Sequence, residues 1–407
     1  MEKQELLPHL FRTEYSKIVA VLCKYFGLDH IEMAEDIASD TFLSAFEIWT
    51  YKGIPEHPTA WLYTVAKNKA KNQLRRSSVF NKKIKKELIH SSIIIEETEP
   101  DLSDQNILDS QLQMLFAVCH PSIPAVSQVG LALRLLCGFG IEEIANAFLT
   151  GKETINKRLL RAKEKLRLEK VHIVFPSESE ISPRLNNVLR TLYLLFNEGY
   201  FSESRNPVLR QDLCEEAMRL TLMLLKYEPT NQPESNALYA LMSFHASRFA
   251  ARTNDRGDMI LYEDQDESLW QTDLIARGAE FLHFASKGNR LSKYHLEAGI
   301  AYWHTVKEME EKWENILLLF DQLLQIEYSP IAALNRTYAL SKVRGKSVAI
   351  EEAEKLKLTN NPFYFTLLGE LYSGSDNQKA KLNFLIAKNL TKTISGKQII
   401  QKKIEPL

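Results

Sequence analysis

The stretch FLTGKETINKRLLRAKEKLR, residues 148–167, contains the end of one helix, a short turn and a longer second helix. Apolar residues in the second helix follow one another at spacings of four, three and four, so they line one side as a stripe that packs into a core. They are Ile155, Leu159, Ala162 and Leu166. The opposite side carries Lys157 and Arg161. This pattern fits an ordinary solvated helix, and it also fits a helix that lies against a polyanion.

The surrounding residues favour a helix–turn–helix over 141–167. IEEIANAFL (141–149) supplies a short amphipathic helix, and TGK (150–152) supplies a tight turn in which Gly151 is free to take a positive φ. In such a motif, the first residues of the second helix meet base edges in the major groove, and neighbouring cations meet phosphates. The residues at those positions are Lys152, Glu153, Thr154, Asn156, Lys157 and Arg161.

A second basic segment strengthens the case for nucleic acid. Residues 67–86 hold nine Lys or Arg and no Asp or Glu, although the whole chain has a net charge of −1. The expected helix HPTAWLYTVAKNKAKNQLRR (57–76) places Trp61 and Tyr63 beside this cationic strip. Aromatic rings next to cations suit unstacked bases as well as duplex phosphates. Core packing of Trp61 is at least as good an alternative.

Composition places the chain among globular proteins, with 45% hydrophobic and 25% charged residues in 407. A chain of this length divides into about two to four domains. No apolar run is long enough to cross a bilayer, and the first residues do not resemble a secretion signal. We therefore expect a cytoplasmic location and no membrane partner. The widely spaced cysteines are expected to be buried free thiols: Cys23, Cys119, Cys137 and Cys214.

Apolar residues recur at helical spacing along the chain, with few Gly and Pro and no set of alternating strands, so an all-α fold is predicted. Residues 5–76 form a first small helical domain, 77–106 a charged linker, and 107–170 a second small domain with the helix–turn–helix. Residues 183–407 form a C-terminal helical block. Helix pairs there recur at about 34 residues, which predicts tetratricopeptide-like repeats or an irregular helical array.

The order of these segments points to a known family. AEDIASDTFLSAFEIW (34–49), followed by 57–76, resembles region 2 of extracytoplasmic-function sigma factors, and 131–167 resembles their region 4. The C-terminal block resembles the tetratricopeptide-like extension of one subgroup, through DQDESLW (264–270) and SPIAALNRTYAL (329–340). The resemblance implies a protein that binds core RNA polymerase, directs initiation at promoters and is not itself an enzyme.

The resemblance also implies site residues. The positions matching the motif that grips the clamp helices of the polymerase β′ subunit are Asp36, Ile37, Asp40, Thr41 and Phe42. The positions assigned to the melted −10 element are Trp61, Asn68, Lys71, Asn72, Arg75 and Arg76. The positions matching the −35 recognition helix are the six named above, from Lys152 to Arg161. For Ile37 and Phe42, core packing is the alternative interpretation.

The expected partners follow from the same resemblance. They are the β′ clamp helices and β flap of core polymerase and promoter DNA, with a regulatory protein as a further candidate partner of the extension. The loop TYKGIPEHP (50–58) matches the segment that captures a flipped base, which offsets part of an unstacking cost of about a few kcal/mol. The linker 77–106 corresponds to the segment in the RNA exit path, where its acidic half is hypothesised to mimic nucleic acid.

Two other classes of protein stay open. A conventional helix–turn–helix regulator with a helical sensor domain would bind duplex DNA without polymerase, and the motif at 34–46 argues against it. A tetratricopeptide-type scaffold with an RNA-binding N-terminal half would bind RNA without promoter selectivity. No catalytic motif or metal-ligand spacing is present, so we expect no catalytic residues, metal or cofactor. The carboxylates of 252–267 do not fit a calcium loop, because Arg252 and Arg256 stand at ligand positions.

Overall fold

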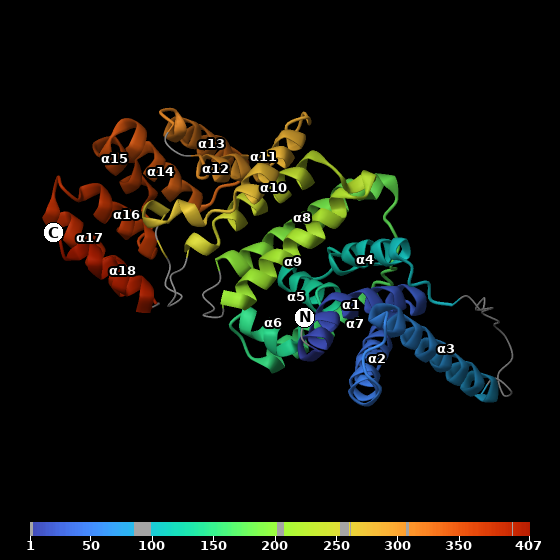
Figure 1. Cartoon of the computed structure of the whole chain (residues 1–407). Coiled ribbons are helices and arrows are strands. Elements are labelled where there is room, and N and C mark those ends of the chain that lie inside the picture. The colour runs from blue at the N-terminus through green and yellow to red at the C-terminus, as the bar shows by residue number, and fades with distance from the viewer. Residues whose placement is uncertain are drawn as a thin grey trace. The chain divides into compact units, whose positions relative to one another are not determined.

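The computed structural model describes residues 3–84, 99–201, 207–252, 260, 262–306, 309–392 and 394–407. Within these ranges every regular element is a helix, and no strand is present (Figure 1). The all-α prediction is confirmed. The chain divides into two compact units, Met1–Thr230 and Asn231–Leu407. In the described part, no helix is long and apolar enough to span a membrane.

The first unit is built on α1, a long helix whose middle is fully buried. Ile18, Val19 and Leu22 have no exposed surface, and α1 packs against α2, α3, α4 and α5. The helices of the unit are α1 (Lys3–Phe26), α2 (Ile31–Lys52), α3 (Pro58–Ile84), α4 (Asp104–Val118), α5 (Ala125–Leu136), α6 (Ile141–Ala147), α7 (Lys152–Leu168), α8 (Glu178–Tyr200) and α9 (Pro207–Leu225), with the short 3-10 turns η1 (Leu28–His30) and η2 (Glu228–Thr230).

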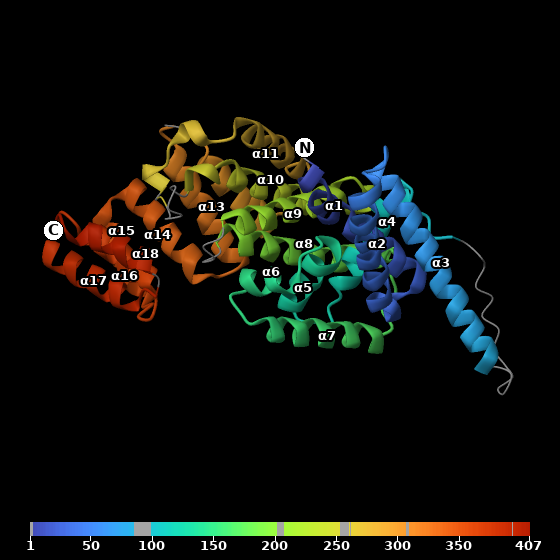
Figure 2. The same cartoon turned by 60° about the horizontal axis from the view of Figure 1, so that its bottom comes forward.

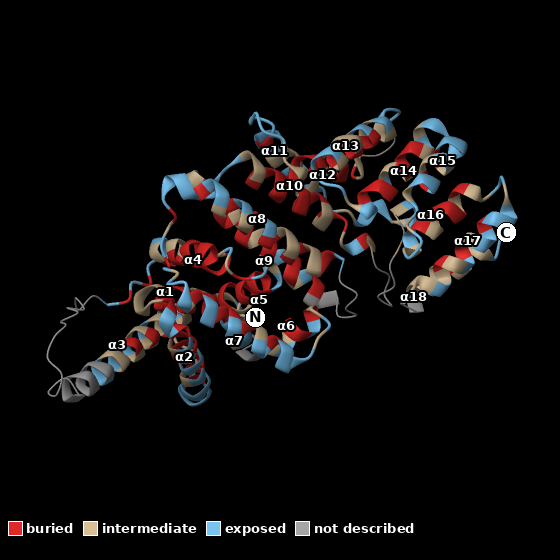
Figure 3. Cartoon of the chain, turned by 180° about the vertical axis from the view of Figure 1, so that it is seen from behind, coloured by how far each residue is buried: buried red, intermediate tan, exposed pale blue. Residues whose placement is uncertain are grey.

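The reversal between α2 and α3 has a clear cause in the sequence. Gly53 ends α2 with φ 83°, a conformation that costs other residues energy, and its N–H donates to Trp49 O over 3.1 Å. Pro58 then begins α3, because proline's fixed φ suits the first turn of a helix. Many residues of α2 and α3 are exposed, whereas α4 and α5 are buried along most of their length (Figure 3).

The linker expected over 77–106 is partly helical where it is described. α3 continues to Ile84, because residues 77–84 contain neither Gly nor Pro to end it, and α4 already begins at Asp104. Just before α4, the Asp101 carboxylate accepts a hydrogen bond from the Ser103 N–H at 2.9 Å. Residues 85–98, the middle of the expected linker, lie outside the described residues.

The first two helices of the expected C-terminal block belong to the first unit. Thr191 Oγ1 of α8 donates to Gln128 Oε1 of α5 at 2.8 Å, and this hydrogen bond is buried. Arg219 of α9 donates to the Leu136 carbonyl at 2.8 Å. At Gly199, α8 approaches α9 so closely that a Cβ would lie 2.6 Å from the Arg210 carbonyl oxygen. The compact unit therefore extends beyond residue 183 to Thr230.

The second unit is a succession of helices in which each packs on the next, as in a helical array. Its α-helices are α10 (Pro233–Ser247), α11 (Thr272–Ala285), α12 (Lys293–Trp303), α13 (Lys312–Ile326), α14 (Pro330–Arg344), α15 (Lys346–Leu356), α16 (Pro362–Tyr372), α17 (Asn377–Leu390) and α18 (Ile394–Ile404). The 3-10 turns η3 (Ala250–Arg252), η4 (Tyr262–Asp264) and η5 (Glu267–Leu269) lie between α10 and α11.

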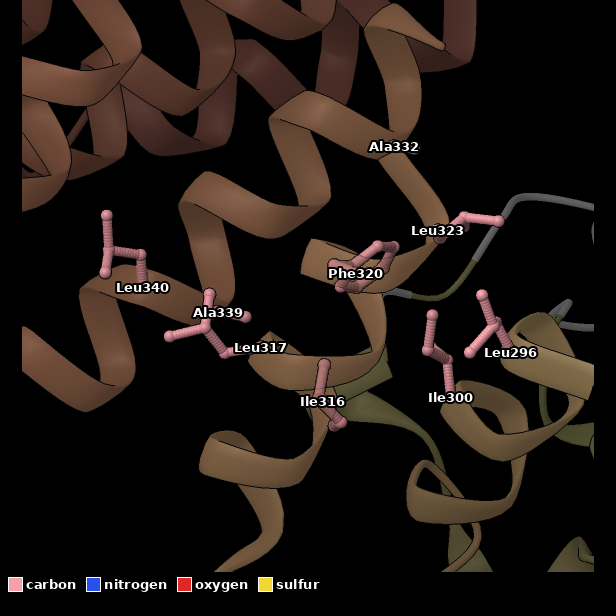
Figure 4. Close-up of a cluster of buried hydrophobic side chains, with 9 residues drawn as sticks. All are labelled: Leu296, Ile300, Ile316, Leu317, Phe320, Leu323, Ala332, Ala339 and Leu340. Carbon is pink, nitrogen blue, oxygen red and sulfur yellow. The ribbon is translucent and has the colours of Figure 1, made fainter. Parts of the chain in front are cut away.

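Three clusters of buried apolar side chains join neighbouring helices of this unit. The cluster in Figure 4 joins α12, α13 and α14 through buried side chains such as Ile300, Ile316 and Phe320. A second cluster joins α14, α15 and α16, and a third joins α17 and α18. Since each core involves only neighbouring helices, the packing is that of stacked helix pairs. Tetratricopeptide-like repeats stay a prediction.

Candidate polymerase and nucleic-acid interface

The predicted polymerase-binding motif divides between the two sides of α2. Asp36 and Asp40, one helical turn apart, are exposed. Ile37 and Phe42 are buried, and Thr41 is fully buried with its hydroxyl donating to the Ile37 carbonyl at 2.7 Å. The structure thus brings two carboxylates to the surface and places the other three residues in the core.

The buried half of the motif supports α2 on α1. The Phe42 ring packs edge-on against the Phe11 ring, with centroids 5.0 Å apart, and lies 6.3 Å from the Tyr15 ring. These rings fix the rotation of α2 about its axis, so they decide which residues of the helix face outward. Ile37, Thr41 and Phe42 are placed to position a surface rather than to form it.

The outward side of α2 contains apolar residues that the sequence prediction missed. Leu43 is 56% exposed and Phe46 is 61% exposed. They continue the side of α2 that carries Asp36 and Asp40, because successive members of this set are three or four residues apart. Exposed large apolar side chains beside carboxylates suit a protein partner. Helical phase could have found them, because Ala38, Phe42, Ala45 and Trp49 already account for the buried stripe.

The basic helix α3 presents a polar strip along its length. Leu62, Ala66 and Ala70 are fully buried, which fixes the inward side. The residues predicted for the −10 element that are exposed are Asn68, Asn72, Arg75 and Arg76. Their spacings of four, three and one place them along one side of the helix. Beyond its packed first turns, α3 extends away from the other helices of the unit (Figures 1 and 2).

Trp61 and Lys71 differ from the four exposed residues of α3. Trp61 is half-buried, and its ring meets the Trp49 ring edge-on at a centroid separation of 5.3 Å. Lys71 is half-buried and forms an ion pair with Glu99. The hydrogen bond and charge of Lys71 lower the pKa of the Glu99 carboxyl below its usual range. An acid from the expected linker therefore pairs with one of the predicted DNA-binding cations.

The turn between α6 and α7 is built differently from the sequence prediction. Gly151 has φ −81° and stands as an extended residue just before α7, so the turn does not use the positive φ that this glycine allows. The positive φ falls on Leu149, at 48°, and the next residue's N–H donates to the Ala145 carbonyl at 2.9 Å. This hydrogen bond closes the end of the short α6, and it forms because Leu149, two positions before Gly151, takes the left-handed conformation.

The stripe predicted for α7 is confirmed. Ile155, Leu159, Ala162 and Leu166 are all buried, and they pack α7 against α5 and α6. All six residues predicted to read the −35 element are exposed: Lys152, Glu153, Thr154, Asn156, Lys157 and Arg161. Lys152 also pairs with Glu142 of α6 at 2.7 Å, where both side chains stay largely in solvent. The outward side of α7 is therefore polar and accessible over its first turns.

Two further cations of α7, Lys163 and Arg167, pair with acids at the start of α2. Lys163 is 9% exposed, and its Nζ lies 2.5 Å from Glu35 Oε2. Arg134 of α5 binds the second oxygen of Glu35 with its Nε at 2.7 Å. Arg167 pairs with Glu32. Two acids thus bind three cations and join the predicted polymerase-binding helix to the predicted recognition helix.

The cysteine prediction is confirmed, and burial raises the pKa of the Cys23, Cys119 and Cys137 thiols. Within the described ranges, no three His, Cys, Asp or Glu side chains are grouped so that they could hold a metal ion.

Comparison with known proteins assigns the N-terminal helices. Residues 10–79, which span most of α1 to α3, match sigma-70 region 2, and residues 184–286 match a family of unknown function, DUF6596. An uncharacterized protein of Rhizobium meliloti (strain 1021) is 32% identical over 361 residues, which cover 87% of this chain and 84% of that protein. No solved structure matches.

The surface of α2 and α3 is therefore that of a sigma-70 region 2 domain, which supports a sigma factor for RNA polymerase and implies contact with core polymerase and promoter DNA. The chain belongs to the same family as the Rhizobium meliloti protein.

Proposed function

We propose that the chain directs RNA polymerase to specific promoters by means of three separate surfaces of its first unit. The exposed side of α2 binds the β′ clamp helices, the polar strip of α3 binds the melted −10 strand, and α7 reads the −35 duplex. The observation that supports this most strongly is that the exposed residues of all three helices fall on the sides that face away from the core. The helices after Thr230 serve as a regulatory or docking extension.

The clamp surface proposed here combines charge with apolar area. Asp36 and Asp40 supply carboxylates, and Leu43 and Phe46 supply exposed apolar surface. Buried aromatic or aliphatic anchors contribute most to protein interfaces, whereas exposed charges mainly set orientation and association rate. We therefore assign the larger part of the affinity to Leu43 and Phe46 and the specificity to the two aspartates.

The two DNA-reading surfaces cannot both reach their targets in the closed unit. The centres of the −35 and −10 elements are about 85 Å apart on straight duplex, at 34–36 Å per turn of about ten base pairs. A compact unit of this length has a radius of gyration of only about 17 Å. The ion pairs of Glu32 and Glu35 with α7 must therefore break when polymerase and promoter are bound.

In vitro transcription with purified core polymerase tests the proposal directly. The full chain should start RNA synthesis at a restricted set of promoters, and Arg161→Ala should reduce initiation there. Arg290→Ala, an equal loss of charge at an exposed residue of the second unit, should leave initiation unchanged. Specific binding to duplex promoters together with failure to associate with core polymerase would favour the conventional regulator instead.

Opening can be followed separately by fluorescence transfer between labels on exposed residues of α3 and α7. Thr64→Cys and Glu164→Cys provide such positions, because both are exposed and the native cysteines are buried. Transfer should be high in the free chain and should fall when core polymerase and promoter DNA are added. Unchanged transfer in an active complex would show that the unit binds without opening.

A further inference from the structure

Arg248, just after α10, is a buried cation that pairs with no acid among the described residues. Arg248 is 7% exposed. Its guanidinium carbon lies 5.4 Å from the centre of the Tyr262 ring and 6.0 Å from the centre of the Trp270 ring. The Nε atom is buried and has no hydrogen-bond partner. Arginine is almost never fully buried unless it is paired, because desolvating the charge is costly. The aromatic faces compensate only part of that cost.

A second cation approaches the same tyrosine. Lys312 Nζ lies 5.3 Å from the centre of the Tyr262 ring, and it donates to Tyr262 Oη at 2.9 Å and to the Val306 carbonyl at 3.0 Å. Both acceptors are neutral. Tyr262 in turn donates its hydroxyl proton to the His304 carbonyl at 3.0 Å. Two positive charges therefore meet around one ring, and the oxygens that Lys312 binds in the described part of the chain are neutral.

The acids nearby are bound to other groups or face solvent. Glu263 accepts from the Tyr338 hydroxyl at 2.6 Å and pairs with Lys342 at 3.2 Å. Asp266 accepts from the N–H and the hydroxyl of Ser268 at the start of η5. Asp264 is exposed. None of them forms an ion pair with Arg248 or Lys312 among the described residues.

Further hydrogen-bonding atoms around this ring are buried and unpaired. Among the residues that the structure describes, Trp270 Nε1, which can only donate, has no acceptor, and His304 Nδ1 and Gln265 Oε1 have no partner. The His304 ring packs against Tyr262 with centroids 4.9 Å apart. Burial and the charges of Arg248 and Lys312 lower the pKa of His304 to about 3, so its ring is neutral and can donate or accept. Unpaired donors beside uncompensated cations call for an anionic acceptor.

We propose that these side chains form a binding site for the oxyanion group of a small solute, a carboxylate or a phosphate. The site, called the Tyr262 site, consists of Arg248, Tyr262, Trp270, His304 and Lys312. A guanidinium and an ammonium supply the charge, and Trp270 supplies a further N–H donor. The rings of Tyr262 and Trp270 form apolar walls for the remainder of the ligand.

A small solute is favoured over a protein surface, because the unpaired atoms are buried among five segments of the chain. The side chains of the site come from the end of α10, from η4, from the end of η5, from the end of α12 and from the start of α13. Binding an anion there neutralises the two cations and ties these segments together, so it stabilises this part of the second unit. The inference concerns the extension alone and does not depend on the proposed promoter recognition.

Thermal melting of the full chain tests the site, with sodium phosphate and sodium malonate as probes for the two ligand classes. Sodium chloride at equal ionic strength is the reference. At least one probe should raise the melting temperature in a saturable way, by about 3 °C or more at ten times its Kd. Phosphate alone would indicate a phosphate ligand, and malonate alone would indicate a carboxylate ligand.

Variants separate this site from general salt effects. Arg248→Met should abolish the saturable response, and Lys312→Met should weaken it at least tenfold in probe concentration. Lys342→Met is the matched control, because Lys342 also lies over aromatic rings, at 5.0 Å from Tyr338, but its ammonium already pairs with Glu263. This control should keep the response. If Arg248→Met fails to fold, the Lys312→Met result decides. The proposal is overturned if neither probe exceeds the chloride reference or if the variants respond like the parent chain.

Discussion

Lys163 of α7 donates a hydrogen bond of 2.5 Å to Glu35 of α2, a residue 128 positions earlier in the chain. Both side chains are about nine-tenths buried, at 11% and 10% exposure. The pair joins the helix proposed to bind polymerase to the helix proposed to read the −35 element. In the free chain, part of the proposed recognition helix is therefore held by an acid of the sigma-70 region 2 match.

Glu35→Gln should destabilise the first unit by about 3 kcal/mol, because it leaves the buried Lys163 and the Arg134 guanidinium without their carboxylate. Thermal melting would show the change as a lower transition temperature. Glu47→Gln, at an exposed position of the same helix, should melt like the parent chain. Equal melting temperatures of both variants would mean that the Glu35 ion pairs make no net contribution to the stability of the first unit.

Arg161→Ala should weaken binding to promoter DNA and reduce the slope of log affinity against log salt by about one, as expected when one phosphate contact is lost. Its position is exposed, so the melting temperature should stay within about 1 °C of the parent, consistent with a surface change of less than 0.5 kcal/mol. The measurement is fluorescence anisotropy at several salt concentrations with core polymerase present. Arg290→Ala is the charge-matched control, and an unaltered slope for Arg161→Ala would remove that residue from the DNA interface.

Asp40→Ala and Phe42→Ala should separate surface contact from support. Asp40 is exposed, so its loss should lower affinity for core polymerase without changing stability. Phe42 is buried against Phe11, so its truncation should cost about 3–5 kcal/mol of stability. Calorimetric melting and a core-binding assay on both variants distinguish the two roles. An Asp40→Ala protein that binds core normally would contradict the clamp assignment.

A chain ending at Thr230 should melt cooperatively, whereas one ending at 175 should not. The shorter chain lacks α8 and α9, and it therefore loses the buried Thr191–Gln128 hydrogen bond and the Arg219 contact to α5. Circular dichroism melts of the two truncations provide the comparison. Matching transitions would show that α8 and α9 are not needed to stabilise the first unit, despite their packing.

The second unit should lose stability as the pH falls from about 6.5 toward 3. The pKa of His304 is lowered to about 3, and that of His245 is well below its usual value, by burial and nearby cations. In this interval the unfolded state binds protons that the folded state excludes, so each pH unit costs about 1.4 kcal/mol per neutral histidine. His304→Phe should flatten the pH dependence of the melting temperature, and His283→Phe, at an exposed position, should not. Parallel curves for parent and His304→Phe would contradict this origin.

Local periodicity was enough to predict the helices and the side of α7 that packs inward. The spacing of Ile155, Leu159, Ala162 and Leu166 fixes which residues of α7 are exposed, because an α-helix turns by a constant angle per residue. The same rule applied to α2 would have separated Asp40 from Phe42. It could not place the turn, where the left-handed residue is Leu149 rather than Gly151, since this depends on how α6 ends.

Only the tertiary structure decided which charges are paired and where the first unit ends. Lys163 and Arg161 look alike in the sequence, yet one is buried against Glu35 and the other faces solvent. α8 has the apolar stripe of the later helices, yet it packs with α5. Periodicity gives the direction of a side chain about its own helix axis, whereas its partner is set by which distant helices that side meets. The unpaired Nε of Arg248 became apparent for the same reason, because its lack of a partner among the described residues depends on everything packed around it.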